Sequence, residues 1–245
     1  MADHIHETLK RLGELSLKHK IVAVGFSGGK DSLATLDLAV KFFSTVIPYY
    51  YYFIPGLRSE AQKLSIAKER YGLEVRQYPS GSGLYCLREG VFCDEIPELE
   101  NLPDLNRRTI LNWVKADTGA TLLLDGQKKA DGPFRRRIFA NTKATMADCY
   151  APLKDWLKWE VLSYLKANRL PIPDPGRGDN GSVSLMDRDL VALHRNHPED
   201  YETLKNFFPY VDAAIMRHQW FTLPCEQAEL EYKRRGKGKV SSIGE

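Results

Sequence analysis

A lysine-bearing diglycine bend is the stretch of this sequence whose residue types and spacing best suit chemistry. It lies between an apolar run, residues 21–26, and a helical pattern, residues 31–43. The bend consists of the consecutive residues Ser27, Gly28, Gly29, Lys30, Asp31 and Ser32. Two glycines let the backbone turn sharply and approach a ligand, and the following helix directs free N–H groups and its positive dipole end at the same place. We therefore predict that this glycine bend holds phosphate.

The polar side chains of the glycine bend fit the same prediction. Lys30 adds a mobile positive charge, Asp31 is an acid able to position a metal ion such as Mg²⁺, and two serines add hydroxyls. The spacing is neither that of the Walker loop nor that of the dinucleotide-binding GxGxxG pattern. The plain alternative is a tight turn capped by Ser32, but a bare turn has no use for the lysine.

Strands and helices alternate along the chain, and this order determines where the bend must lie. Strands are predicted at residues 21–26, 46–54, 74–78 and 121–125. Helices are predicted at residues 6–17, 31–43, 60–71, 107–117, 156–168, 187–194 and 201–208. The alternation predicts an α/β fold, a Rossmann-like parallel sheet with helices on both faces. Ligands bind such sheets beyond the carboxyl ends of the strands, which singles out residues 27–32, 55–58 and 126–131.

Four consecutive tyrosines, at positions 49–52, lie in the second predicted strand. A row of aromatic side chains could stack nucleic acid bases. Tyrosine also suits a half-buried strand, so we interpret the run as part of the core or of a sheet face. After the third strand, residues 80–83 indicate a Gly/Ser loop, and residues 84–105 indicate irregular structure.

The composition is that of an ordinary globular protein. Of 245 residues, 43% are hydrophobic and 27% are charged, so a sizeable core can form. The formal net charge of +3 is too small to argue for nucleic acid as a partner. Basic residues cluster at positions 135–137 and between positions 233 and 239, and we interpret both clusters as solvated surface.

Cysteine content and hydropathy indicate the setting in which the chain works. Four cysteines are too few and too scattered for a disulfide scaffold. No apolar stretch approaches the roughly 20 residues that span a bilayer, and the N-terminal pattern is not that of a secretory signal. We therefore expect a cytoplasmic protein with no membrane partner.

The glycine bend and two later stretches carry a resemblance to known enzymes. SGGKDS after an apolar strand resembles the PP-loop of the ATP pyrophosphatase, or adenine nucleotide alpha hydrolase, superfamily. Residues 125–131, DGQKKAD, resemble a segment that this superfamily places near the nucleotide phosphates, with lysines instead of the usual arginine. Residues 151–156, APLKDW, and the pattern after them are similar to a stretch of the phosphoadenosine phosphosulfate (PAPS) reductases. The similarity covers residues 21–174.

This resemblance implies an adenine nucleotide alpha hydrolase-like fold and an enzyme that binds ATP with Mg²⁺. Such enzymes cleave ATP between the α and β phosphates, leave pyrophosphate in the glycine loop and transfer AMP to an acceptor. The implied catalytic residues are Lys30, Asp31 and Lys128, with Asp31 also as magnesium ligand. The implied nucleotide-binding residues are Ser27, Gly28, Gly29, Lys30, Asp31, Ser32, Gly126, Lys128 and Arg135. For Lys128 and Arg135, a solvated basic loop is the alternative.

The sequence does not identify the acceptor. A nucleic acid, a small metabolite and a sulfur-carrier protein all remain open, as do homo-oligomerisation and the need for a partner subunit. One alternative function is a reductase of PAPS, or of adenosine phosphosulfate (APS), in which Cys225 attacks the sulfo group. Against it, the Glu-Cys-Gly-(Leu/Ile)-His stretch of those reductases is missing. A second alternative is a non-catalytic nucleotide-binding subunit of a larger complex.

Two further expectations concern a cluster and the domain organisation. The chain lacks the Cys-Cys and Cys-x-x-Cys pairs that hold an iron–sulfur cluster in some relatives, so we expect no iron–sulfur cluster. Residues 1–175 are predicted to form the nucleotide-binding α/β domain, residues 176–230 a loop and helical extension, and residues 231–245 a basic, disordered tail. In PAPS reductases a loop near positions 174–184 closes over the nucleotide, and a plain surface loop is the alternative here.

Overall fold

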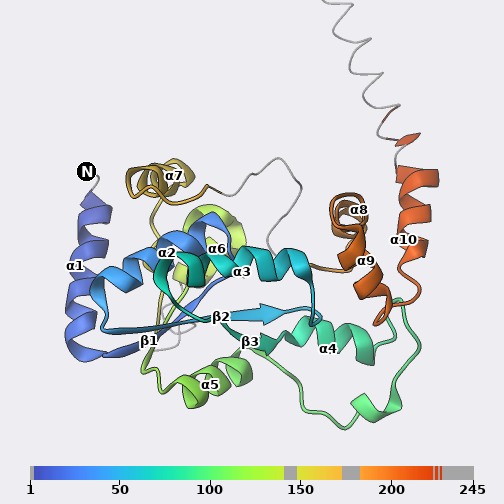
Figure 1. Ribbon diagram of the computed structural model, residues 1–245, viewed down its shortest axis with the longest axis horizontal. Helices are drawn as coiled ribbons and strands as arrows, with labels where there is room; N and C mark the ends of the chain where they lie inside the picture. The colour runs from blue at the N-terminus through green and yellow to red at the C-terminus, as the bar shows by residue number, and fades with distance from the viewer. Residues whose placement is uncertain (1–2, 141–147, 173–182, 223, 226, 228–245) are drawn as a thin grey trace, which may run out of the picture.

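A computed structural model describes residues 3–140, 148–172, 183–222, 224, 225 and 227 (Figure 1). Within these residues, five strands form one sheet in the order β3-β2-β1-β4-β5, and every neighbouring pair is parallel. The strands are β1 (Ile21–Gly25), β2 (Thr45–Tyr52), β3 (Arg76–Pro79), β4 (Leu122–Leu124) and β5 (Cys149–Tyr150). The prediction of a Rossmann-like parallel sheet with helices is confirmed.

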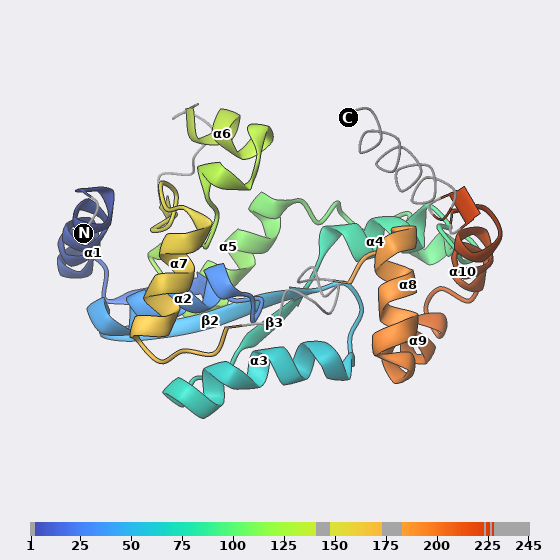
Figure 2. The same cartoon turned by 90° about the horizontal axis from the view of Figure 1, so that it is seen from above.

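Helices cover both faces of this sheet, as Figure 1 and Figure 2 show. One face carries α5, whereas α1, α2, α3 and α7 pack on the other. The α-helices are α1 (Asp3–Lys18), α2 (Lys30–Phe42), α3 (Arg58–Tyr71), α4 (Gly81–Arg88), α5 (Arg107–Thr118), α6 (Pro133–Ala140), α7 (Lys158–Ala167), α8 (Asp187–Asn196), α9 (Pro198–Lys205) and α10 (Asp212–Arg217). Short helical turns are η1 (Pro97–Leu99), η2 (Lys129–Asp131) and the π-helical η4 (His218–Thr222).

Side chains of the central strands alternate between the two faces. Val22 and Val24 of β1 pack with α1, α2, α3 and α7, whereas Ala23 between them packs with α5. Leu123 of β4 lies on the same side as Ala23. Because successive side chains of a strand point to opposite faces and both faces are covered here, a continuous apolar run is what these buried strands require.

The helices α8, α9 and α10 gather at the end of the molecule toward which β2 points (Figure 1, Figure 2). Leu190 and Leu204 of these helices belong to one buried cluster with Phe53 and Ile54, which directly follow β2. The rings of Phe53 and Phe208 stack with centroids 5.6 Å apart. The C-terminal helices therefore pack beside the carboxyl end of β2, where a ligand site is expected.

Helix α4 forms where the sequence predicts a Gly/Ser loop. Ser80 is its N-cap and accepts the N–H of Gly83 at 3.2 Å. A Cβ on Gly83 would collide with the carbonyl oxygen of Phe53, so close packing rather than flexibility explains this glycine. Helix α6, which contains the three consecutive arginines, and the short strand β5 were also not predicted.

Several predicted features fall outside the described residues. The predicted domain boundary between residues 175 and 176 does so, as does the predicted tail, residues 231–245. The part of the predicted extension that is described contains α8, α9 and α10. None of the helices in the described ranges is long and apolar enough to cross a membrane.

Candidate functional site

The order of the strands creates a switch point between β1 and β4. From β1 the chain builds β2 and β3 on one side, and it then returns to build β4 and β5 on the other. Open α/β sheets bind ligands in the crevice beyond the carboxyl ends of such strands. The glycine bend follows β1, and residues 126–131 follow β4, so both predicted segments lie at this crevice.

The glycine bend is held in shape by Ser32 and by close packing on α3. The Ser32 hydroxyl accepts the N–H of Ser27 at 3.2 Å and donates to the carbonyl of Gly29 at 3.0 Å. Gly28 has a φ of +71°, and a Cβ on it would lie 2.7 Å from Cβ of Lys63 and 2.9 Å from the Lys63 carbonyl oxygen. Glycine is the residue that satisfies both the dihedral and the contact.

The backbone N–H groups of residues 28–32 are left open at the start of α2. None of them donates a hydrogen bond to any part of the chain that the structure describes, and Gly29, the N-cap, provides no side-chain cap. These amides carry the positive end of the α2 dipole. The glycine bend is therefore not packed shut, and its amides are available to an anion.

The N-terminus of α3 differs, because the chain itself already fills it. Asp200 of α9 is 2% exposed and accepts the N–H of Arg58 at 2.7 Å and that of Ser59 at 2.8 Å. Burial acts to raise the pKa of Asp200, but the hydrogen bonds from Ser59 and Arg58 outweigh it and lower this pKa below its ordinary value. The ligand position predicted at residues 55–58 is thus taken by the chain's own carboxylate.

The three predicted catalytic side chains meet at the first turn of α2. The Lys30 ammonium lies 2.7 Å from Oδ2 of Asp31, and the Lys128 ammonium lies 2.6 Å from Oδ1. Lys128 is 2% exposed and also pairs with Asp131 at 3.0 Å. The Lys128–Asp31 contact has the distance of an ion pair without the angles of a hydrogen bond. Charge rather than a directed bond therefore holds this buried ammonium at the bend.

Gly126 allows the loop after β4 to reach α2. A Cβ on Gly126 would lie 2.9 Å from the carbonyl carbon of Asp31 and 3.1 Å from the nitrogen of Ser32. Glycine here lets two backbones touch, and this contact seats Lys128 beside Asp31. In this structure Gly126 contributes close packing to the site.

Asp31 does not fit a magnesium site as the structure stands. Both of its oxygens face lysine ammonium groups, so a cation could bind only if Lys30 or Lys128 moved away. Among the described residues, no group of three or more His, Cys, Asp or Glu side chains could hold a metal ion. The magnesium role of Asp31 stays a prediction.

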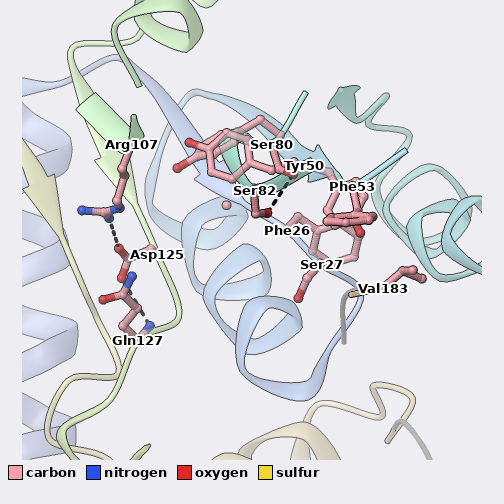
Figure 3. A pocket seen from close by; sticks show the side chains of 13 residues that line it. Phe26, Ser27, Tyr50, Phe53, Ser80, Ser82, Arg107, Asp125, Gln127 and Val183 are labelled. Atoms are coloured by element: carbon pink, nitrogen blue, oxygen red, sulfur yellow. Dashed lines mark hydrogen bonds and ion pairs between the residues drawn. The ribbon is translucent and has the colours of Figure 1, made fainter. Parts of the chain in front are cut away.

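A cavity of about 320 Å³ opens beside the glycine bend, among the carboxyl ends of β1, β2, β3 and β4 (Figure 3). It is lined by Gly25, Phe26, Ser27, Tyr49, Tyr50, Tyr51, Phe53, Ser80, Ser82, Arg107, Asp125, Gln127 and Val183. Figure 3 shows Arg107, Asp125 and Gln127 on one side and aromatic rings, including Tyr50 and Phe53, on the other. An aromatic wall facing a polar wall suits a ligand with a flat ring and a polar edge.

Three of the four consecutive tyrosines line this cavity. Tyr49 and Tyr50 are buried, as the interpretation of the run as core implies, but that interpretation missed their place on the cavity wall. Burial raises the pKa of all three, and that of Tyr51 rises to about 12. The hydroxyls are thus protonated at neutral pH, and Tyr50 donates to Oε1 of Glu60 at 2.5 Å.

A row of hydrogen bonds links α5 to α6 along the polar wall. Arg107 donates to Oδ2 of Asp125 at 3.0 Å, and Oδ1 of Asp125 accepts the N–H of Gln127 at 3.2 Å (Figure 3). The side chain of Gln127 accepts from Arg135 at 2.7 Å. Burial raises the pKa of Asp125, and the Arg107 charge opposes that rise. Arg135 thus contacts a residue of the cavity wall, and its role in nucleotide binding stays a prediction.

Sequence reasoning did not select several residues that line the cavity. Phe53 follows β2 directly and Ser80 follows β3 directly, so the rule for carboxyl ends of strands was sufficient to find them. Arg107 begins a helix and is not next to any strand in the sequence. Its place on the wall depends on how α5 packs, which no local pattern indicates.

The described residues also bear on the reductase alternative and on the expected loop. Cys225 is an exposed free cysteine and is not among the described residues that line the cavity. Residues 174–182 of the expected loop lie outside the described residues. Val183, near the end of that loop, lines the cavity, so this part of the loop lies beside the site.

Comparison with known proteins gives backbone similarity only. No known protein-family pattern matches the chain, and no curated protein matches it in sequence. The U34-tRNA thiolase NcsA from Methanococcus maripaludis is 20% identical with a TM-score of 0.46, over 85% of this chain and 79% of the thiolase. The NH3-dependent NAD synthetase from Campylobacter jejuni is 17% identical with a TM-score of 0.50, over 86% of this chain and 94% of the synthetase.

One expectation is corrected by this comparison. The absence of paired cysteines leads us to expect no iron–sulfur cluster, yet the NcsA structure is that of the thiolase with its 4Fe-4S cluster. This finding contradicts the expectation of no iron–sulfur cluster, and the expectation is withdrawn.

The comparison with NAD synthetase bears on the architecture. The match extends over most of both chains, and at 17% identity the likeness lies in the backbone arrangement rather than in the sequence. That enzyme was solved in complex with a nitrate ion. The parallel α/β sheet described above is thus a known architecture, and this chain shares the fold of NH3-dependent NAD synthetase.

Proposed function

We propose that this chain is a PAPS reductase-like PP-loop enzyme that binds ATP and cleaves it between the α and β phosphates. Pyrophosphate leaves and the AMP group passes to an acceptor, where it remains or is displaced as free AMP when the activated acceptor is modified with sulfur. The observation that carries the proposal is the open N-terminus of α2. Its amides, residues 28–32, have no acceptor among the described residues and lie at the switch point beside an aromatic cavity.

The two parts of the site suit the two ends of an adenine nucleotide. The phosphates meet the α2 amides, and the positive end of the helix dipole favours their charge. The flat base enters the cavity, where aromatic rings cover its face and the wall of Asp125 and Gln127 offers hydrogen-bond partners to its edge. Ser27 belongs to both the bend and the cavity lining, so the two parts are continuous.

Cleavage requires that charge on the departing pyrophosphate be neutralised. A nucleophile, which is a group of the acceptor or, where no acceptor is present, a water molecule, attacks the α phosphorus. The bond from that phosphorus to the bridging oxygen breaks, and the oxygen leaves with the pyrophosphate. Lys30 and Lys128 stand at the bend where this charge develops. Lys128 is fixed by burial, whereas the side chain of Lys30 is 31% exposed and is free to turn from Asp31 toward a phosphate.

The test measures ATP binding and pyrophosphate release by the purified full chain, with MgCl₂ present, for wild type, Lys30→Ala and Lys18→Ala. Lys18 is the matched control, because it is an exposed lysine at the end of α1, next to the amino end of β1. We expect Lys30→Ala to lower release about 100-fold and Lys18→Ala to leave it unchanged.

Four outcomes contradict this proposal. The proposed site is refuted if the wild type does not bind ATP, or if all three proteins release pyrophosphate at the same rate. Tight ATP binding without release favours the non-catalytic subunit. Sulfite release from PAPS that depends on thiol and on Cys225 favours the reductase.

A further inference from the structure

Helix α6 presents a basic and aromatic surface that the proposed nucleotide site does not use. Arg136 and Arg137 are exposed, and neither forms an ion pair with any described residue. Phe134 is 69% exposed and lies three positions before Arg137, so the two side chains share a face of the helix. We call Phe134, Arg136 and Arg137 the α6 patch.

The α6 patch is joined to the edge of the cavity. Arg135, between the patch residues in sequence, points to Gln127 and donates to it at 2.7 Å, and Gln127 lines the cavity. At the other end of the polar wall, Arg108 follows the cavity-lining Arg107 and is also exposed without an ion pair to the described residues. Outward-facing arginines thus lie at both ends of this wall.

Other cations near the site are neutralised by the protein. Arg107 pairs with Asp125 at 3.0 Å, and Lys129 pairs with Asp155 at 2.5 Å. The arginines of the α6 patch differ in having no such partner among the residues that the structure describes. A solvated basic face would account for the charge, but it gains nothing from an exposed phenyl ring in the same face. Positive charge beside an exposed ring is the combination that binds unpaired nucleotides.

We infer that the α6 patch binds a single-stranded nucleic acid. The arginines pair with phosphates, and a base stacks on the ring of Phe134. The role of this strand as the acceptor of AMP or sulfur rests on the proposed function, whereas its binding does not. The patch at the edge of the cavity would hold the strand beside the α phosphate.

The test measures fluorescence anisotropy of labelled, mixed-sequence single-stranded RNA and DNA with the full chain over a range of salt concentrations. The test variant is Arg136→Glu/Arg137→Glu, and the matched control is Lys18→Glu/Lys20→Glu. Lys18 and Lys20 are exposed and lie next to the amino end of β1, opposite the cavity, and the change in net charge is the same.

We expect the wild type to bind with a strong dependence on salt. In the test variant, the slope of log K against log salt should fall in magnitude by about 1.4, since each lost phosphate contact removes about 0.7 for single strands. The control should keep the wild-type slope, and so should Arg136→Lys/Arg137→Lys. Phe134→Ala should weaken binding about tenfold without changing the slope, because it removes stacking only.

The RNA and DNA arms identify the strand. Tighter binding of RNA would indicate contacts to the 2′-hydroxyl, and equal binding would indicate recognition of any single strand; both support the inference. No binding by the wild type, an equal loss in test and control variants, or tighter binding of an acidic peptide at the same patch would overturn it. ATP binding by the wild type is measured in the same samples. A protein that binds nucleic acid but not ATP then refutes only the proposed function. A protein that binds ATP but not nucleic acid refutes only this inference.

Discussion

Replacing Gly28 with alanine tests the glycine bend most sharply. The φ of +71° costs an L-residue about 1–2 kcal/mol. The new Cβ would lie 2.7 Å from Cβ of Lys63 and 2.9 Å from its carbonyl oxygen, so either the bend or α3 must shift. Such overpacking costs about 1–3 kcal/mol more. The free energy of unfolding should therefore fall by about 2–5 kcal/mol.

Gly72→Ala is the matched control for the steric part of this loss. Gly72 ends α3 with a φ of +68°, and no atom lies within 4 Å of the position of its missing Cβ. Only the dihedral cost applies there, about 1–2 kcal/mol. For a chain of this length each kcal/mol lowers Tm by about 2–4 °C, so Gly28→Ala should melt well below Gly72→Ala. Thermal and urea unfolding of the two variants measure the difference.

ATP affinity gives the second readout of the same pair of variants. A shifted bend moves the amides of residues 28–32, so Gly28→Ala should bind ATP much more weakly, whereas Gly72→Ala should bind it like the wild type. Equal unfolding free energies for the two variants would refute the steric contact with Lys63. Full ATP affinity in a destabilised Gly28→Ala protein would refute the anion-binding role of the bend.

Two further predictions concern buried carboxyl groups. Asp200→Ala removes the acceptor of the Arg58 and Ser59 N–H groups and should cost about 2–3 kcal/mol in urea unfolding at pH 7. Because the pKa of Asp200 is lowered in the folded state, this cost should shrink as the pH falls from 3.8 through that lowered pKa, and a cost that stays constant over this fall in pH would contradict it. Glu60 accepts a hydrogen bond from Tyr50, and burial raises the pKa of its carboxyl group. The free energy of unfolding of the wild type should therefore rise relative to that of Glu60→Gln as the pH falls from 7 toward 4.5. A difference in unfolding free energy that stays constant over this range would argue against burial as the cause.

The parts of the site that the sequence predicted are those encoded by neighbouring residues. The strand, the glycine bend and α2 are contiguous, so their chemistry is visible in one stretch of sequence. The meeting of Lys128 with Asp31 was predicted only through resemblance, since it depends on the pairing of β1 with β4 and on the backbone contact at Gly126.

The parts that the sequence could not predict depend on packing between distant segments. Asp200 fills the α3 N-terminus from 142 residues away along the chain, so the rule for strand ends, which uses only local order, predicted a ligand position at residues 55–58 that the chain itself occupies. Helix α4 is capped by Ser80 and places Gly83 against the carbonyl of the distant Phe53, whereas the local Gly/Ser composition favours a loop. Arg135 turns toward Gln127 because α6 forms beside the loop after β4, and no periodicity marked that helix.

The central claim is that the first amides of α2 are an open anion site, and amide NMR during titration with inorganic pyrophosphate and then ATP tests it most directly. The largest shifts should occur at the N–H groups of residues 28–32, while those of Arg58 and Ser59, already bound by Asp200, should not move. Saturating pyrophosphate that leaves the amides of residues 28–32 unshifted, or that shifts Arg58 and Ser59 instead, would contradict the claim.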